Sequence, residues 1–167
     1  MASRSHQPVE RRVADALDGE TLATVESCTG GLIGSRLTDV PGSSTYFDRG
    51  FVTYSNDAKL ELGVSRESLD EDGAVSEAVA REMAQAGRDV AGTTWCVSTT
   101  GIAGPAGGTE DKPVGTVYVG VAYAGPWGTS RSNTRVRRQN YEGTRTEIKA
   151  QIATGALELL IEAIEDW

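Results

Sequence analysis

The chain has 167 residues, of which 38% are apolar, and its 24 acidic and 16 basic residues give a formal net charge of −8 at pH 7. This length suits a single domain that buries a core without disulfide staples, and the acidic balance argues against a general nucleic-acid binder, because phosphate contacts need a basic face. Two cysteines and one histidine exclude a disulfide framework and argue against a zinc site.

The sequence shows no segment that would cross a membrane. No apolar run approaches the roughly eighteen residues of a spanning helix, and residues 1–12 are polar, without the apolar centre of a signal peptide. We therefore expect a soluble, cytoplasmic protein that binds neither membranes nor nucleic acid. Only three of the basic residues are lysines, and we interpret this acidic, lysine-poor composition as halophile-like.

Helix and strand patterns alternate along the first half of the chain. Apolar residues at helical spacing and runs of β-branched or aromatic residues predict these elements. In chain order they are a helix over 8–18, a strand over 22–25, a helix over about 30–38 capped by Ser27 or Thr29, a strand over 49–54 and a helix over 56–62.

The second half ends in a strand pair and a long helix. In chain order we expect a helix from Ser76, a strand over 95–100, two strands over 114–123 and about 130–136, and a helix over about 142–164. This order predicts an α/β fold, a three-layer α/β/α sandwich on a mixed β-sheet. The whole chain, 1–167, is predicted to form one domain with residues 1–7 frayed.

Two glycine-rich segments, 26–31 and 101–116, each follow a predicted strand. The second holds five glycines and two prolines within fifteen residues. Glycine costs conformational entropy on folding, so this density indicates a backbone that approaches a ligand closely, although a mobile loop is the alternative. Ligands of such sheets bind beyond the carboxyl ends of the strands. The two segments are therefore predicted to face each other across one pocket.

The segment 26–31, with the sequence ESCTGG, is no Walker A loop, because no Gly-Lys-Ser/Thr follows it. It places backbone N–H groups at a predicted helix start, which favours an anion such as phosphate. An ordinary helix cap with two permissive glycines is the alternative.

The available side chains restrict the catalytic chemistry. The single histidine, His6, lies near the N-terminus, which excludes Ser-His-Asp and Cys-His arrangements and leaves lysine, tyrosine or a carboxylate as the base. The segment 43–59 contains two serines, Tyr54 and Lys59. A lysine held away from water has a lowered pKa and can activate a neighbouring serine. The alternative is a solvated lysine beside a half-buried tyrosine.

Several ordered motifs point to a known family. They are ESCTGG (26–31), PGSS (41–44), RGFVTYSN (49–56), GAVSE (73–77), GIAGP (101–105) and KPVGTV (112–117). With them the chain, from about residue 8 to 164, closely resembles the CinA C-terminal domain family, whose enzymatic members are nicotinamide-nucleotide amidohydrolases, also called NMN deamidases.

The resemblance implies a stand-alone enzyme of NAD recycling that hydrolyses nicotinamide mononucleotide to nicotinate mononucleotide and ammonia, uses no metal or cofactor, and forms a homo-oligomer. It implies that Ser44, Tyr54 and Lys59 carry catalysis. The substrate is expected to contact the glycine turns and two basic residues that could hold its phosphate: Ser27, Thr29, Gly30, Gly31, Thr100, Gly101, Gly104, Arg145 and Lys149. A catalytically silent domain that binds a nucleotide or a partner is the alternative.

Overall fold

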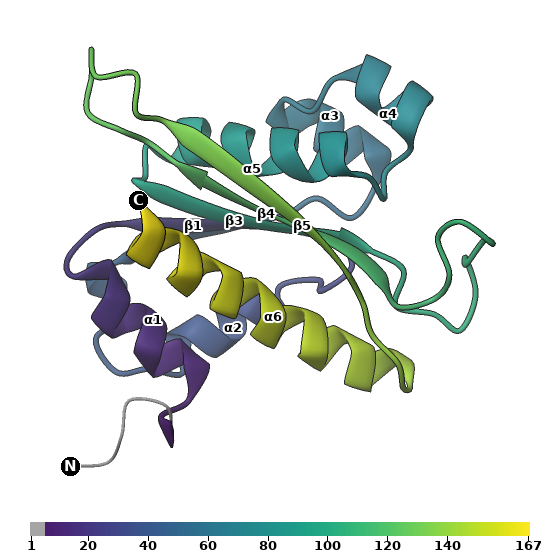
Figure 1. Ribbon diagram of the computed structural model, residues 1–167, viewed down its shortest axis with the longest axis horizontal. Coiled ribbons are helices and arrows are strands. Elements are labelled where there is room, and N and C mark those ends of the chain that lie inside the picture. The colour runs from purple at the N-terminus through teal and green to yellow at the C-terminus, as the bar shows by residue number, and fades with distance from the viewer. Residues whose placement is uncertain (1–5) are drawn as a thin grey trace.

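A computed structural model of the chain describes residues 6–167. Most of the segment 1–7, which is predicted to be frayed, lies outside the described residues. Five strands form one mixed sheet in the order β2-β1-β3-β4-β5 (Figure 1). Strand β1 pairs in parallel with β2 and β3, whereas β4 pairs antiparallel with β3 and β5. The strands are β1 (Leu22–Glu26), β2 (Phe47–Val52), β3 (Trp95–Gly101), β4 (Thr116–Tyr123) and β5 (Asn133–Asn140).

Helices cover both faces of this sheet (Figure 1). Helices α1, α2 and α6 lie on one face, and α3, α4 and α5 lie on the other. Their bounds are α1 (Val9–Leu17), α2 (Leu32–Thr38), α3 (Asn56–Leu62), α4 (Arg66–Asp72), α5 (Glu77–Ala91) and α6 (Arg145–Asp166), with a 3₁₀ turn, η2 (Ser43–Thr45), before β2. The predicted three-layer α/β/α sandwich on a mixed sheet is confirmed. None of the described helices has the length and apolar character of a membrane span.

Two elements differ from what the sequence pattern predicts. Helix α4 buries none of its residues, so it lacks the apolar stripe by which a helix is found, and only the cap from the Ser65 side chain to the Ser68 N–H marks its start. Strand β5 begins and ends later than predicted, because its sequence, NTRVRRQN, carries one large apolar residue. Its register comes from pairing with β4 rather than from its own hydrophobicity.

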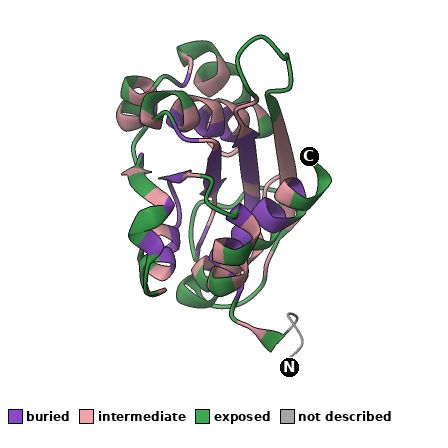
Figure 2. Ribbon diagram, turned by 90° about the vertical axis from the view of Figure 1, so that its left-hand side faces the viewer, coloured by how far each residue is buried: buried purple, intermediate pink, exposed green. Residues whose placement is uncertain are grey.

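The core lies on both faces of the sheet, where the buried residues of the strands meet the inner sides of the helices (Figure 2). At the pole where β3 begins, Trp95 stacks on Trp167, with ring centroids 5.6 Å apart, and also contacts Tyr123 at 4.6 Å. The Arg135 guanidinium lies 5.0 Å from the centre of the Trp167 ring. This aromatic cluster fastens the C-terminal end of α6 to the sheet.

Gly115 allows the long loop 102–115 to close against the chain that follows β5. Its φ is +93°, its N–H donates to the Ile102 carbonyl, and an added Cβ would lie 1.8 Å from the Tyr141 carbonyl oxygen. We expect Gly115→Ala to lower the free energy of unfolding by at least about 3 kcal/mol, because backbone strain adds to the clash. Urea denaturation would measure the change.

Gly128 offers a matched control, since its φ is +80° and nothing lies within 4 Å of an added Cβ. Gly128→Ala should therefore lower the free energy of unfolding by only about 1 kcal/mol, the cost of a left-handed backbone conformation for alanine. Equal losses in the two variants would show that the contact with Tyr141 is unimportant.

Candidate functional site

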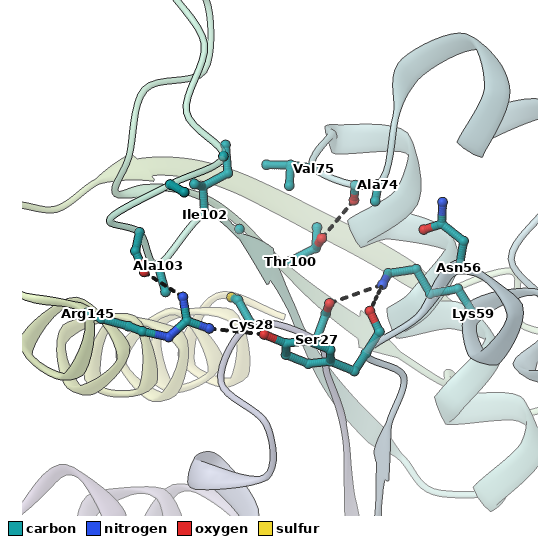
Figure 3. A pocket seen from close by; sticks show the side chains of 15 residues that line it. Ser27, Cys28, Asn56, Lys59, Ala74, Val75, Thr100, Ile102, Ala103 and Arg145 are labelled. Carbon is teal, nitrogen blue, oxygen red and sulfur yellow. Dashed lines mark hydrogen bonds between the residues drawn. The ribbon is translucent and has the colours of Figure 1, made fainter.

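A pocket of about 290 Å³ opens beyond the carboxyl ends of β1 and β3 (Figure 3). It is built from the turns after these strands, the start of α3, the segment before α5 and the first residue of α6. Fifteen residues line it: Ser27, Cys28, Tyr54, Asn56, Lys59, Ala74, Val75, Thr100, Gly101, Ile102, Ala103, Gly104, Ala106, Gly107 and Arg145. The two glycine-rich segments do meet here, through Ser27 and Cys28 of the first and residues 101–107 of the second.

Lys59 is a buried basic residue that lines the pocket. Ser55 caps helix α3 by accepting the Ala58 N–H, and the Lys59 side chain, only 1% exposed, turns inward from this helix. Its Nζ lies 3.0 Å from Ser27 Oγ and donates to the carbonyl oxygens of Thr53, at 2.8 Å, and Tyr54, at 3.2 Å (Figure 3). Burial lowers the pKa of Lys59 below that of a solvated lysine.

Ser27 is held in place by the strand ladder. It follows Glu26, the last residue of β1, and its N–H donates to the Thr99 carbonyl on β3 at 3.0 Å. The side chain is 9% exposed and points toward Lys59 (Figure 3). A hydroxyl group fixed on a rigid strand end therefore faces a buried amine.

Arg145 and Tyr54 lie at the mouth of the pocket. The Arg145 guanidinium donates to the Tyr54 hydroxyl at 3.1 Å and to the Gly104 carbonyl at 2.5 Å (Figure 3). Tyr54 is 60% exposed, so its ring borders solvent, while its backbone carbonyl holds Lys59 inside. The mouth therefore carries a cation, Arg145, whose hydrogen-bond partners are both neutral groups that an anionic ligand could displace.

The domain matches a known family over nearly its whole length. The model of the family described as CinA C-terminal domain covers residues 6–164. The chain belongs to the CinA C-terminal domain family. Among solved structures, this CinA C-terminal domain is similar to the competence/damage inducible protein CihA from Agrobacterium tumefaciens, with 42% identity, a TM-score of 0.85 and coverage of 94% of this chain and 93% of that one.

Further relatives show the same likeness. A CinA superfamily protein from Klebsiella pneumoniae has 33% identity and a TM-score of 0.87, covering 96% of this chain and all of that one. A CinA-like protein of Chlorobium limicola is 51% identical over 82% of this chain and 32% of its own length. The CinA C-terminal domain thus spans about a third of the length of the curated relatives it matches.

The CinA motif PGSS does not reach the pocket. Ser44 lies exposed in η2, which precedes β2, whereas Tyr54 and Lys59 follow β2. A six-residue strand is about 20 Å long, so Ser44 and Lys59 lie at opposite ends of the sheet. The structure does not bring Ser44 together with Tyr54 and Lys59. The serine beside Lys59 is Ser27, which the family resemblance places among the substrate contacts.

The turn 26–31 of the CinA domain already holds an anion of its own. The buried Glu26 carboxylate accepts the N–H groups of Ile33, at 2.8 Å, and Gly34, at 3.1 Å, at the start of α2. The predicted cap of α2 by Ser27 or Thr29 is wrong: the cap residue is Gly31, and no side chain caps the helix. Because Glu26 occupies the helix start, this turn is a poor site for phosphate.

Of the other expected substrate contacts, Thr100, Gly101, Gly104 and Arg145 line the pocket, whereas four do not. The Thr29 hydroxyl is buried against that of Thr99, at 2.8 Å. Lys149 is half-buried further along α6. The residues outside the pocket are Thr29, Gly30, Gly31 and Lys149.

Both cysteines of the CinA domain are buried free thiols. Cys28 lines the pocket, and burial raises the pKa of its thiol to about 11, which leaves little thiolate at neutral pH. Burial also raises the pKa of Cys96. Over residues 6–167, no group of three or more His, Cys, Asp or Glu side chains could hold a metal ion.

Proposed function

We propose that this domain is an amidohydrolase that converts nicotinamide mononucleotide to nicotinate mononucleotide and ammonia, with Ser27 as its nucleophile in place of Ser44. The contact of 3.0 Å between Ser27 Oγ and the buried Lys59 Nζ carries the proposal. A serine paired with a buried lysine is an activated nucleophile suited to acyl transfer. The choice of this nucleotide rests on the family resemblance.

The three partners of Lys59 favour its role as a base. Two of them, the carbonyl oxygens of Thr53 and Tyr54, can only accept hydrogen bonds. A neutral amine has two N–H groups, which these carbonyls would take, and its lone pair would then face Ser27 Oγ, the one partner with a proton to give. The lowered pKa of Lys59 increases the fraction of this neutral form.

The reaction follows from this pair. Ser27 Oγ attacks the carboxamide carbon while its proton passes to Lys59 Nζ, and the carbonyl oxygen becomes an oxyanion. The N–H groups of Cys28 and Thr29, which directly follow Ser27 in the chain, are the proposed donors to that oxyanion. Lys59 then protonates the leaving nitrogen, ammonia departs, and a water activated by Lys59 hydrolyses the ester, which returns the proton to Ser27.

Arg145 is the proposed ligand of the substrate phosphate. It is the one cationic lining residue besides the catalytic Lys59, and its present partners are a tyrosine hydroxyl and a carbonyl oxygen. A phosphate would exchange these neutral partners for a charge-assisted, bidentate contact. The pocket volume of about 290 Å³ is near the lower end for ligand sites, which favours one nucleotide over a dinucleotide.

Ammonia release from purified protein tests this function. Nicotinamide mononucleotide should yield equal amounts of ammonia and nicotinate mononucleotide, whereas the riboside, which lacks the phosphate, should react far more slowly. If the mononucleotide binds by calorimetry but no ammonia forms at any salt concentration, the domain is the catalytically silent nucleotide binder instead. If it neither binds nor reacts, both readings are wrong.

The pH dependence follows from the direction of the Lys59 shift. Because burial lowers the pKa of Lys59, the neutral base forms at a lower pH than for a solvated lysine, whose pKa is about 10.4. We expect kcat/KM to rise with pH and to level off at a lower pH than it would with a solvated lysine as the base. A profile that falls as the pH rises from 6 to 9 would contradict Lys59 as the base.

A further inference from the structure

The pocket lies between two walls that the sequence separates by about thirty residues. One wall is the segment 74–75, between α4 and α5, and the other is the glycine-rich loop 101–107 (Figure 3). The second wall belongs to the long loop between β3 and β4, which projects beyond the sheet in Figure 1. The spacing between the walls determines what the pocket can hold.

The outer part of this loop has little packing to hold it. All seven residues from 105 to 111 are exposed, and the pair Ile102 and Thr116 closes only the base of the loop, through the bond from the Ile102 N–H to the Thr116 carbonyl at 2.9 Å. Segments with few buried apolar contacts open at low free-energy cost. Arg145 donates to the Gly104 carbonyl and Arg138, from β5, donates to the Asp111 carbonyl at 2.7 Å, but neither contact joins the loop to the opposite wall.

Lys112 makes that connection. Its Nζ crosses from the loop to the carbonyl oxygens of Asp72, at 3.0 Å, and Val75, at 2.5 Å. Asp72 is the last residue of α4, where carbonyls lack helical partners and the helix dipole favours a cation. Deeper in the pocket, the Thr100 hydroxyl donates to the Ala74 carbonyl at 2.7 Å. The walls are thus joined at the base by Thr100 and at the rim by Lys112.

Lys112 itself does not line the pocket. Its neighbours in the loop fix its orientation, because its N–H donates to the Thr109 hydroxyl at 3.1 Å and its carbonyl accepts the Thr109 N–H at 2.8 Å. The two groups that carry the proposed chemistry, Ser27 and Lys59, stand on other elements. Moving the loop would therefore alter the binding wall and leave the nucleophile and base in place.

We propose that Lys112 is a positioning residue, which fastens the loop 102–115 to Asp72 and Val75 and so sets the pocket width that the nucleotide requires. The inference rests on the proposed function for its substrate. Without the Lys112 contacts, only a fraction of the molecules would hold the loop in its binding position, and the apparent affinity would fall by that fraction.

The test compares Lys112→Met, which keeps the length but loses the charge and the donors, with Lys112→Arg, which keeps both. For Lys112→Met we expect KM for nicotinamide mononucleotide to rise about tenfold while kcat changes less than twofold, since the lost interaction is made equally in the ground and transition states. Lys112→Arg should restore most of the affinity. Arg131→Met, which removes an exposed cation from the hairpin at the other end of β4, is the charge-matched control.

Amide hydrogen exchange supplies a readout that needs no turnover. In Lys112→Met, exchange of the amides over 103–112 should quicken, while exchange in β1 and β3 should not change. Lys112→Gln, with a shorter neutral side chain, repeats the measurement should the methionine variant fold poorly. Wild-type exchange in this loop for both variants would overturn the inference, as would a loss in kcat at unchanged KM. If the wild type releases no ammonia, the proposed function fails. The hydrogen-exchange measurement would still decide whether Lys112 holds the loop.

Discussion

Ser27→Ala is expected to reduce kcat for ammonia release at least about 1,000-fold while leaving the thermal midpoint nearly unchanged. The substitution removes the hydroxyl that faces Lys59 Nζ at 3.0 Å. The two other hydroxyl groups that line the pocket have partners elsewhere: that of Thr100 donates to the Ala74 carbonyl at 2.7 Å, and that of Tyr54 accepts from Arg145 at 3.1 Å. The strand bond from the Ser27 N–H to the Thr99 carbonyl stays. Initial rates with nicotinamide mononucleotide measure the effect, and circular dichroism checks the fold.

Ser44→Ala is the matched variant for this experiment. Ser44 lies exposed at the other end of the sheet, so its loss should leave kcat within about twofold of the wild type, as expected for a surface substitution away from the site. The opposite pattern, with Ser44→Ala inactive and Ser27→Ala active, would refute the proposed nucleophile.

Lys59→Met is expected to lower kcat about 1,000-fold, the contribution of a well-placed general base. Methionine fills a similar volume in a position that is only 1% exposed, so the core should remain packed. If Lys59 acts only by taking the Ser27 proton, the double variant Ser27→Ala/Lys59→Met should be no slower than Ser27→Ala alone, since residues that act as a unit are not additive. Additive losses would show that Lys59 acts on another group.

The same variant has a stability signature. Because the pKa of Lys59 is lower in the folded than in the unfolded state, the unfolded chain binds more protons between those two pKa values, and the stability of the wild type should rise with pH there. Lys59→Met should lack this rise. Urea denaturation at two alkaline pH values would compare the two proteins.

The sequence sufficed for the layer order and for Lys59, one half of the proposed reacting pair. Alternating patterns predict the mixed sheet. Setting His6 aside leaves lysine, tyrosine or a carboxylate as the base, and the family resemblance selects Lys59 among them. The distance of Ser44 from Lys59 could not be predicted in this way, because a motif shows which residues are present and not at which end of a strand they lie. The motif PGSS precedes β2, whereas Ser27 and Lys59 follow β1 and β2, at the end where the parallel strands bring their carboxyl termini together.

The internal anion was also beyond the sequence pattern. A carboxylate at the end of a strand, such as that of Glu26, is usually solvated. Here the glycines at 30 and 31 turn the chain so that α2 begins directly over it, and two N–H groups close on its oxygens. Glu26, which accepts the N–H groups at the start of α2, precedes the turn in the sequence. The sequence of the turn alone therefore predicts a free phosphate site.

The aromatic cluster at the far pole determines what intrinsic fluorescence can report. The three tryptophans are Trp95 and Trp167, stacked on one another, and Trp127, fully exposed in the hairpin after β4. None of them lines the pocket. Tryptophan emission should therefore report the loss of contact between α6 and β3 during unfolding. It should change little when a nucleotide binds. A fluorescence measurement of binding therefore needs a label near the mouth of the pocket, beside Arg145.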